Sequence, residues 1–272
     1  MRCFTVPLAD ADLHVEAQGD TPKTVFLHGM GGDTHTWDLL WQALGEAFPA
    51  LRYDLRGFGL SHERGERPFD HADDLLVLLD ATQTGPCNLV GVSMGGSIAL
   101  NFALGHPEKV SKLILISPAL VAWEWSEQWR PLWRQIAACA KAGAMDEARQ
   151  LWWRHPLFAT TRDGPSGPIL YDSIMRYAGK QWCGDHHKSM LPDVDRLHAL
   201  EVPTVLLTGE RDLPDFRLIA DLIAASSGQV QRIDYPARGH MLHLEVPEDC
   251  ARAIKAFLAS PAPLRYSQSV RQ

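Results

Sequence analysis

The sequence predicts an α/β fold in which a mostly parallel sheet carries helices on both faces and is interrupted by one helical insertion. Two observations carry this prediction. Short apolar runs alternate with helical segments along the first 118 residues, and the same alternation resumes after about residue 200. Continuous apolar strands that alternate with helices are typical of parallel sheets buried on both faces. With 272 residues, the chain can form one large domain with an insertion.

The first part of the chain supplies most of the predicted elements. Two short runs at the start favour a hairpin, and three later strands end at glycine-rich loops that lead toward helical segments. The predicted strands are 4–8, 13–17, 24–27, 51–54, 88–92 and 112–117, and the predicted helices are 37–48, 71–81 and 95–106.

The pattern changes between about residues 118 and 200, where helical stretches dominate and seven of the nine tryptophans occur. The last predicted elements are strand 204–207, helix 215–225, strand 230–234 and helix 248–258. We therefore expect four parts, which are core residues 1–118, a helical cap at 119–198, core residues 199–262 and a frayed tail at 263–272. A ligand should bind at the carboxyl ends of the strands, beneath the cap.

The composition argues against several classes of protein. It is 46% hydrophobic and 22% charged, as in ordinary globular proteins, and the net charge of −7 without a basic run argues against nucleic-acid binding. The five cysteines are scattered and form no C-x-x-C pair, so we expect reduced thiols and no zinc site. No signal peptide is visible at the start, so a cytoplasmic location is expected.

The stretch 81–107 contains no Asp, Glu, Lys or Arg, which raises the alternative of a membrane span. About 20 apolar residues suffice to cross a bilayer. This stretch, however, contains several glycines, prolines and asparagines and has no flanking aromatic or basic belt. We therefore predict a buried strand followed by a helix of small residues, and no membrane span.

The sequence GVSMG at 91–95 matches G-x-S-x-G, with a predicted strand before it and a predicted helix after it. Gly91 and Gly95 permit a tight turn around Ser93. The turn holds the Ser93 hydroxyl at a helix N-terminus, where backbone N–H groups favour developing negative charge. The alternative is a glycine-rich turn with an idle serine. The strand–turn–helix context favours a nucleophile.

A serine nucleophile requires a base that is itself oriented by an acid, in the chain order Ser, Asp or Glu, His. The loop after the strand at 204–207 offers Glu210, Asp212 and Asp215. The loop after the next strand offers His240 and His243. We favour Asp212, which fits a short loop, and His240, which precedes a helix. Asp215 is expected to begin that first helix, and His243 to line the pocket or lie on the surface.

The backbone amides that bind the oxyanion are expected at Met30, in the loop HGMGG at 28–32, and at Met94, directly after the serine. A phosphate-binding loop is the alternative for HGMGG. The chain has neither G-x-x-x-x-G-K-[ST] nor a dinucleotide-binding G-x-G-x-x-G after a strand, so no nucleotide cofactor is expected. His186 and His187 beside Asp185 lack a further ligand, so we expect a solvated edge there and no metal.

Together these motifs identify a resemblance to the α/β-hydrolase superfamily from about residue 12 to residue 258, carried by HGMGG, DLRGFGLS, GVSMGG, GERD and GH. The resemblance implies the α/β-hydrolase fold and serine hydrolase chemistry without a cofactor. It assigns the nucleophile, the acid, the base and the two oxyanion amides to Ser93, Asp212, His240, Met30 and Met94.

Departures from the family patterns narrow the expected activity. Haloalkane dehalogenases and epoxide hydrolases carry aspartate where this chain has Ser93. Carbon–carbon hydrolases usually have Asn before the nucleophile and Trp after the catalytic histidine, where this chain has Val92 and Met241. The chain looks more like esterases and enol-lactonases. We expect hydrolysis of a small to medium carboxylic ester or lactone through an acyl-serine; a carbon–carbon hydrolase or a ligand receptor with little turnover stays an alternative.

Two further features have a structural and a functional interpretation. Arg56 is expected to brace its own loop near Asp54 rather than to bind substrate. Trp125, Trp129 and Trp133 follow one another at helical spacing, and we favour the core of the cap over the wall of the pocket for them. No oligomeric state follows from the sequence.

Overall fold

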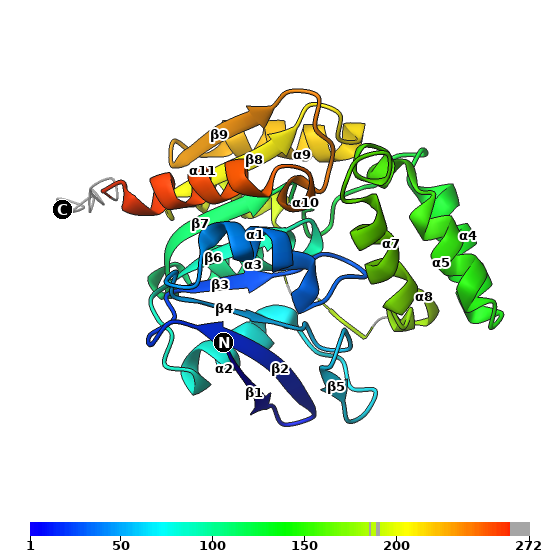
Figure 1. The fold of residues 1–272 in the computed structure, drawn as a ribbon, viewed down its shortest axis with the longest axis horizontal. Helices are drawn as coiled ribbons and strands as arrows, with labels where there is room; N and C mark the ends of the chain where they lie inside the picture. The colour runs from blue at the N-terminus through cyan, green and yellow to red at the C-terminus, as the bar shows by residue number, and fades with distance from the viewer. Residues whose placement is uncertain (185, 189–190, 262–272) are drawn as a thin grey trace.

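The computed structural model describes residues 1–184, 186–188 and 191–261. Within them, nine strands form one sheet in the order β1-β2-β4-β3-β6-β7-β8-β9, with β5 paired to β2 (Figure 1). The sheet is antiparallel around β2 and parallel from β4 to β9, which confirms the predicted class. The strands are β1 Arg2–Pro7, β2 Ala11–Gln18, β3 Thr24–Leu27, β4 Ala50–Tyr53, β5 His62–Glu63, β6 Cys87–Val92, β7 Val110–Ile116, β8 Thr204–Gly209 and β9 Val230–Tyr235.

Helices cover both faces of the sheet because alternate strand residues are apolar on each side. Val90 and Ile114 pack in the cluster with α1 (Asp38–Leu44), α10 (Leu242–Glu245) and α11 (Pro247–Ala259). Leu89 and Leu113 pack in the cluster with α2 (His71–Ala81), α3 (Met94–Gly105) and α9 (Pro214–Ser226). This double burial fixes the loops at the carboxyl ends of the strands.

The helices inserted between β7 and β8 lie together at one end of the sheet (Figure 1). We call residues 119–198 the helical cap. Its helices are α4 Arg130–Lys141, α5 Met145–Trp153, α6 Ala159–Arg162, α7 Gly167–Arg176 and α8 Lys180–Cys183.

The two ends of the cap are joined through Asp193. Its Oδ2 accepts a hydrogen bond from Val121 N (3.1 Å), and its own N–H donates to the Val121 carbonyl (3.4 Å). Asn101 Nδ2, on α3, donates to Asp193 Oδ1 (2.7 Å). Asp193 is fully buried, and this burial raises its pKa to about 6. One carboxylate therefore ties both ends of the cap to α3.

Several boundaries differ from the prediction. The helix expected at 37–48 is α1, which ends at Leu44 because Gly45 adopts φ 83°. A 3₁₀ turn at Thr34–Trp37 precedes it, capped by the Asp33 side chain. The short elements β5 and α10 were not predicted. The tail expected at 263–272 lies outside the described residues.

Residues 81–107 contain the end of α2, then β6 and α3, rather than one long apolar helix. In the part of the chain that the structure describes, no helix has the length and apolar character needed to cross a bilayer. All five cysteines are free thiols.

Candidate active site

Ser93 occupies the turn between β6 and α3, with φ 54° and ψ −117°. This backbone conformation is strained for a residue with a side chain and persists where the surroundings enforce it. The Ser93 N–H donates to the Ile116 carbonyl, and the Ser93 carbonyl accepts from Ser97 N and Ala119 N, each at 3.0 Å. These bonds hold the serine at the carboxyl end of β6, on the wall of a cavity.

The two glycines of the turn are required by close backbone packing. A Cβ on Gly91 would lie 2.3 Å from the Gly95 carbonyl oxygen, and a Cβ on Gly95 would lie 2.1 Å from the Leu27 carbonyl oxygen. Both distances are far below van der Waals contact. The motif GVSMG therefore reflects the space available between β3, β6 and α3.

Asp212 and His240 follow β8 and β9 and lie together. His240 Nδ1 is 2.9 Å from Asp212 Oδ2 and 3.1 Å from Asp212 Oδ1, and both side chains are buried. Asp212 Oδ1 also accepts from Leu213 N (2.7 Å), which fixes the carboxylate. With Nδ1 donating its proton to Asp212, the neutral ring of His240 presents an unprotonated Nε2.

Ser93 and His240 line one cavity of about 370 Å³, together with Met30 and Met94. Among the described residues, no group forms a hydrogen bond with the buried Nε2 of His240. Catalytic hydrogen bonds are often long in ligand-free structures and tighten when substrate binds. The structure therefore brings together a serine, a histidine and its buried carboxylate partner in the predicted order.

The other two acid candidates, Glu210 and Asp215, occupy different positions. Glu210 is exposed, whereas Asp215 is buried at the start of α9, as expected. The Asp215 carboxylate accepts from Trp123 Nε1 (3.1 Å), Ser126 N (3.1 Å) and Ser126 Oγ (2.6 Å). Asp215 thus fastens the first residues of the cap to the core.

His243 does not lie on the pocket wall or the surface, so that expectation was wrong. It is completely buried and its ring centroid lies 5.0 Å from that of Trp37. Burial first, and the nearby His240 second, lower the pKa of His243 to about 3. A neutral imidazole can pack in this apolar layer beneath α10.

The loop that carries Met30 is held against Ser93 by the neighbouring residues. A Cβ on Gly29 would lie 3.3 Å from Ser93 Cβ. His28, whose role the sequence analysis did not predict, accepts from Leu55 N at Nε2 (3.0 Å) and donates from Nδ1 to the Gly29 carbonyl (2.9 Å). Both bonds fit a neutral ring, and burial lowers the pKa of His28.

Met94 is the first residue of α3, and the first N–H groups of a helix have no intrahelical acceptor. The Met94 amide therefore lies directly after Ser93 and has no hydrogen-bond acceptor inside the helix. Met30 and Met94 line the same cavity as the serine, which places both expected oxyanion amides near the site.

Comparison with known proteins identifies the fold. A family model described as the alpha/beta hydrolase fold matches residues 25–139. The structure superposes on a thermophilic esterase from Thermogutta terrifontis with a TM-score of 0.78 and 24% identity, covering 95% of this chain and 98% of that one. The chain has the α/β-hydrolase fold.

Two more similarities to proteins of known name extend over most of the chain. The enol-lactonase from Burkholderia xenovorans superposes with a TM-score of 0.78 and 19% identity, covering 94% of this chain and 100% of that one. The pimeloyl-[acyl-carrier protein] methyl ester esterase of Nitrosomonas europaea is 24% identical over 269 residues, 91% of this chain and 100% of that protein. These three similar proteins are thus two esterases and an enol-lactonase.

The cap of this α/β-hydrolase fold places three tryptophans on the wall of the Ser93 cavity. Trp125 stacks on Trp129 at 4.5 Å, Trp129 stacks on Trp133 at 6.0 Å, and all three line the cavity with Trp152. The three rings are partly buried and pack against the hydrophobic core, as expected, but they also form the pocket wall, which was the less favoured interpretation. Trp182 does belong to the core, where its ring meets Tyr177 edge-on at 4.8 Å.

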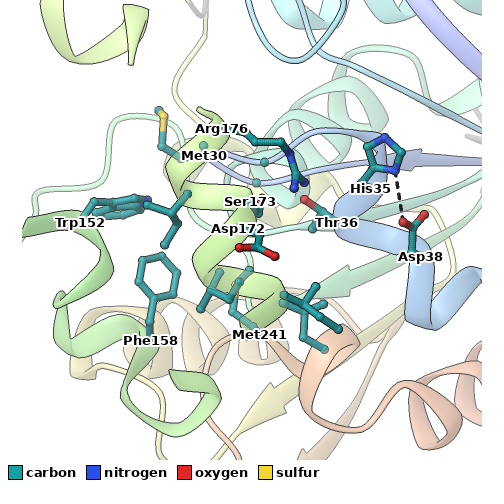
Figure 2. A pocket seen from close by; sticks show the side chains of 17 residues that line it. Met30, His35, Thr36, Asp38, Trp152, Phe158, Asp172, Ser173, Arg176 and Met241 are labelled. Atoms are coloured by element: carbon teal, nitrogen blue, oxygen red, sulfur yellow. Dashed lines mark hydrogen bonds and ion pairs between the residues drawn. The ribbon is translucent and has the colours of Figure 1, made fainter. Parts of the chain in front are cut away.

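A second cavity of about 430 Å³ lies beside the first and shares Gly29, Met30, Trp152 and Phe158 with it. Figure 2 shows Asp172 and Arg176 of α7 around this space, together with the hydrogen-bonded pair His35 and Asp38. This mixed lining contrasts with the aromatic wall next to Ser93. The sequence analysis did not predict it because it forms between distant segments.

Arg56 holds its loop in place, as expected, through the carboxylates of Asp74 and Asp10. It binds both carboxylate oxygens of Asp74 (2.8 and 2.6 Å) and one of Asp10 (2.6 Å). The Arg56 guanidinium is therefore committed to structure.

His186 and His187 are both partly exposed, and the ring of His187 also lies 4.5 Å from that of His71. Asp185 lies outside the described residues. Within the described ranges, no group of three or more His, Cys, Asp or Glu side chains could hold a metal ion.

Proposed function

We propose that the protein is a carboxylic ester hydrolase that cleaves a small to medium ester or lactone through an acyl-Ser93 intermediate. The observation that carries this proposal is the buried His240–Asp212 pair. Among the described residues His240 Nε2 has no hydrogen-bond partner, and His240 lines the same cavity as Ser93. A serine becomes a useful nucleophile when such a base takes its proton.

The proposed reaction has two halves. Ser93 Oγ attacks the substrate carbonyl while His240 Nε2 accepts the hydroxyl proton, and the Asp212 carboxylate stabilises the imidazolium that forms. The amides of Met30 and Met94 donate to the oxyanion. The departing alkoxide then takes the proton from His240. Water then attacks the acyl-serine while His240 takes its proton, and as the acyl–Oγ bond breaks His240 returns that proton to Ser93 Oγ and the acid leaves. In a lactone, the alcohol and the acid remain in one molecule.

The substrate class is supported by the cavity and by the related proteins. A space of about 370 Å³ lined mainly by aromatic and apolar side chains suits a small to medium apolar ester. The names of the similar proteins include a methyl ester esterase and an enol-lactonase. The division into core 1–118, cap 119–198 and core 199–262, and the cytoplasmic location, belong to the same proposal.

The test combines covalent labelling with turnover. A fluorophosphonate should add one adduct per chain, located at Ser93 by peptide mass spectrometry, and the protein should hydrolyse p-nitrophenyl acetate. The Ser93→Ala variant, as matched control, should do neither. Labelling without turnover of any ester would instead favour a ligand receptor. Turnover of a ring-cleavage diketone but not of esters would favour a carbon–carbon hydrolase.

A further inference from the structure

The charged side chains on the wall of the Ser93 cavity are of one sign, apart from the titratable His240. Among the described residues that line it, no carboxylate occurs, and the two permanent charges are Arg130 and Arg134 of α4. The remaining lining is dominated by tryptophan, leucine, phenylalanine and methionine side chains. An apolar cavity with guanidinium groups at an exposed helix suits a ligand that is apolar along its length and anionic at one end.

The two arginines differ in their partners. Arg130 donates to the Trp125 carbonyl (2.5 Å) and lies 3.2 Å from a Glu127 oxygen. For Arg134, by contrast, the described part of the chain contains no carboxylate within ion-pair distance and no hydrogen-bond acceptor for the guanidinium. In a chain with 33 acidic and 26 basic residues, an unpaired guanidinium beside a substrate cavity is available to a ligand.

The position of Arg134 on α4 places it beside the tryptophans that line the Ser93 cavity. Arg130 and Arg134 are four residues apart and therefore lie on the same side of the helix. Trp129 and Trp133 precede them by one residue each and stack along the same cavity. An acyl or alcohol chain that starts at Ser93 and follows these rings reaches a helix that carries two guanidinium groups.

We propose that Arg134, with Arg130 beside it, binds a carboxylate at the far end of an apolar substrate whose ester group lies at Ser93. This inference rests on the proposed esterase function and names its substrate class as a half-ester of a dicarboxylic acid or an ester with an equivalent terminal anion. Arginine suits this role because its planar guanidinium can bind a carboxylate through two parallel hydrogen bonds.

The experiment compares two p-nitrophenyl esters of equal chain length, the hemiadipate and the hexanoate, which differ by a terminal carboxylate. The Arg134→Gln variant should lower the ratio of kcat/KM for the hemiadipate to that for the hexanoate by about 5- to 20-fold, mainly through KM. Arg134→Lys should recover part of the ratio, and added salt should reduce the wild-type ratio. A ratio unchanged by Arg134→Gln overturns the inference.

The matched control is Arg154→Gln, which removes the same charge from an exposed position of the cap outside both cavities. This variant should leave the ratio unchanged; an equal fall in both variants would assign the effect to net charge and overturn the inference.

Binding of monomethyl adipate and methyl hexanoate to Ser93→Ala, with and without Arg134→Gln, is measured by calorimetry as a readout that needs no turnover. Tighter binding of the half-ester that Arg134→Gln abolishes supports the inference. Turnover of neither ester contradicts the proposed function, whereas equal turnover of both, with no preference in binding, contradicts the anion site alone.

Discussion

The sheet core and the helical cap are stabilised in different ways. In the core, the parallel strands are buried on both faces, and backbone packing forces glycine at positions 91 and 95. The cap packs through stacked and edge-on aromatic rings and is fastened to the core by two aspartates, Asp193 through Asn101 of α3 and Asp215 through Ser126. Under the proposed function, the core loops would therefore position the reacting groups, and the cap side chains would shape the cavity for substrate.

The largest expected effect tests the core. Ser93→Ala should lower kcat by at least about 10³-fold, because loss of a triad member leaves only the contribution of the oxyanion hole and binding. The melting temperature should change little, since the hydroxyl is not part of the packed core. Ester hydrolysis and thermal unfolding measure the two quantities. A variant that keeps a tenth of the activity would show that another nucleophile acts.

The second effect separates two acids that are close in sequence, Asp212 in the loop after β8 and Asp215 at the start of α9. Asp212→Asn should lower kcat by about 10³-fold or more, because the amide no longer holds His240 in the tautomer with a free Nε2. Asp215→Asn, its matched control, should lower kcat less than tenfold but destabilise the segment at Trp123 and Ser126. Kinetics and thermal unfolding of both variants provide the measurement. Equal losses of kcat would remove the distinction between the two carboxylates.

The third effect tests the cap. Trp129→Ala or Trp133→Ala should change the relative kcat/KM of short and long p-nitrophenyl esters by about 10-fold or more, since apolar contacts discriminate by 1–3 kcal/mol per methylene. The pH profile should stay the same, because His240 and Asp212 belong to the core and not to the cap. Trp153→Ala is the control, since Trp153 packs on Tyr171 away from the Ser93 cavity. If all three variants preserve the chain-length ranking, selectivity lies in the core.

The smallest effect concerns the connection between the cap and the core. Burial raises the pKa of Asp193 from its ordinary value near 4 to about 6, so its ionisation disfavours the folded state. The stability that protonated Asp193 contributes is full below about pH 4 and is lost as the pH rises through 6, a total of about 3 kcal/mol. Between pH 5 and 7.5, the wild-type melting temperature should therefore fall by about 3–6 °C relative to Asp193→Asn.

Buried histidines act in the opposite direction over this range. Burial lowers the pKa of His155 to about 4 and that of His243 to about 3, so acid destabilises the fold through both. Because both variants contain these histidines, the difference between their melting curves isolates Asp193. Parallel curves for the two proteins would contradict the raised pKa.

The features that could be predicted from the sequence are those that depend on local backbone packing and on short loops. The turn at Ser93 was predictable because tight packing demands glycine on both sides, and the pairing of Asp212 with His240 follows from short loops after neighbouring strands. The direction of Trp129 was not predictable, because the phase of α4 depends on how the cap meets the core. Burial of His243 depends in the same way on the contact of α10 with Trp37.

The mutual hydrogen bonds of Val121 and Asp193 mean that the chain leaves the core and re-enters it at one place. The cap can therefore be exchanged as a cassette. A different insert whose ends meet at this point would leave the order of β7 and β8 intact, and the cost of closing loops of different length grows only slowly. Substrate range in such a scaffold can change through one insertion site while the nucleophile, the acid and the base stay where they are.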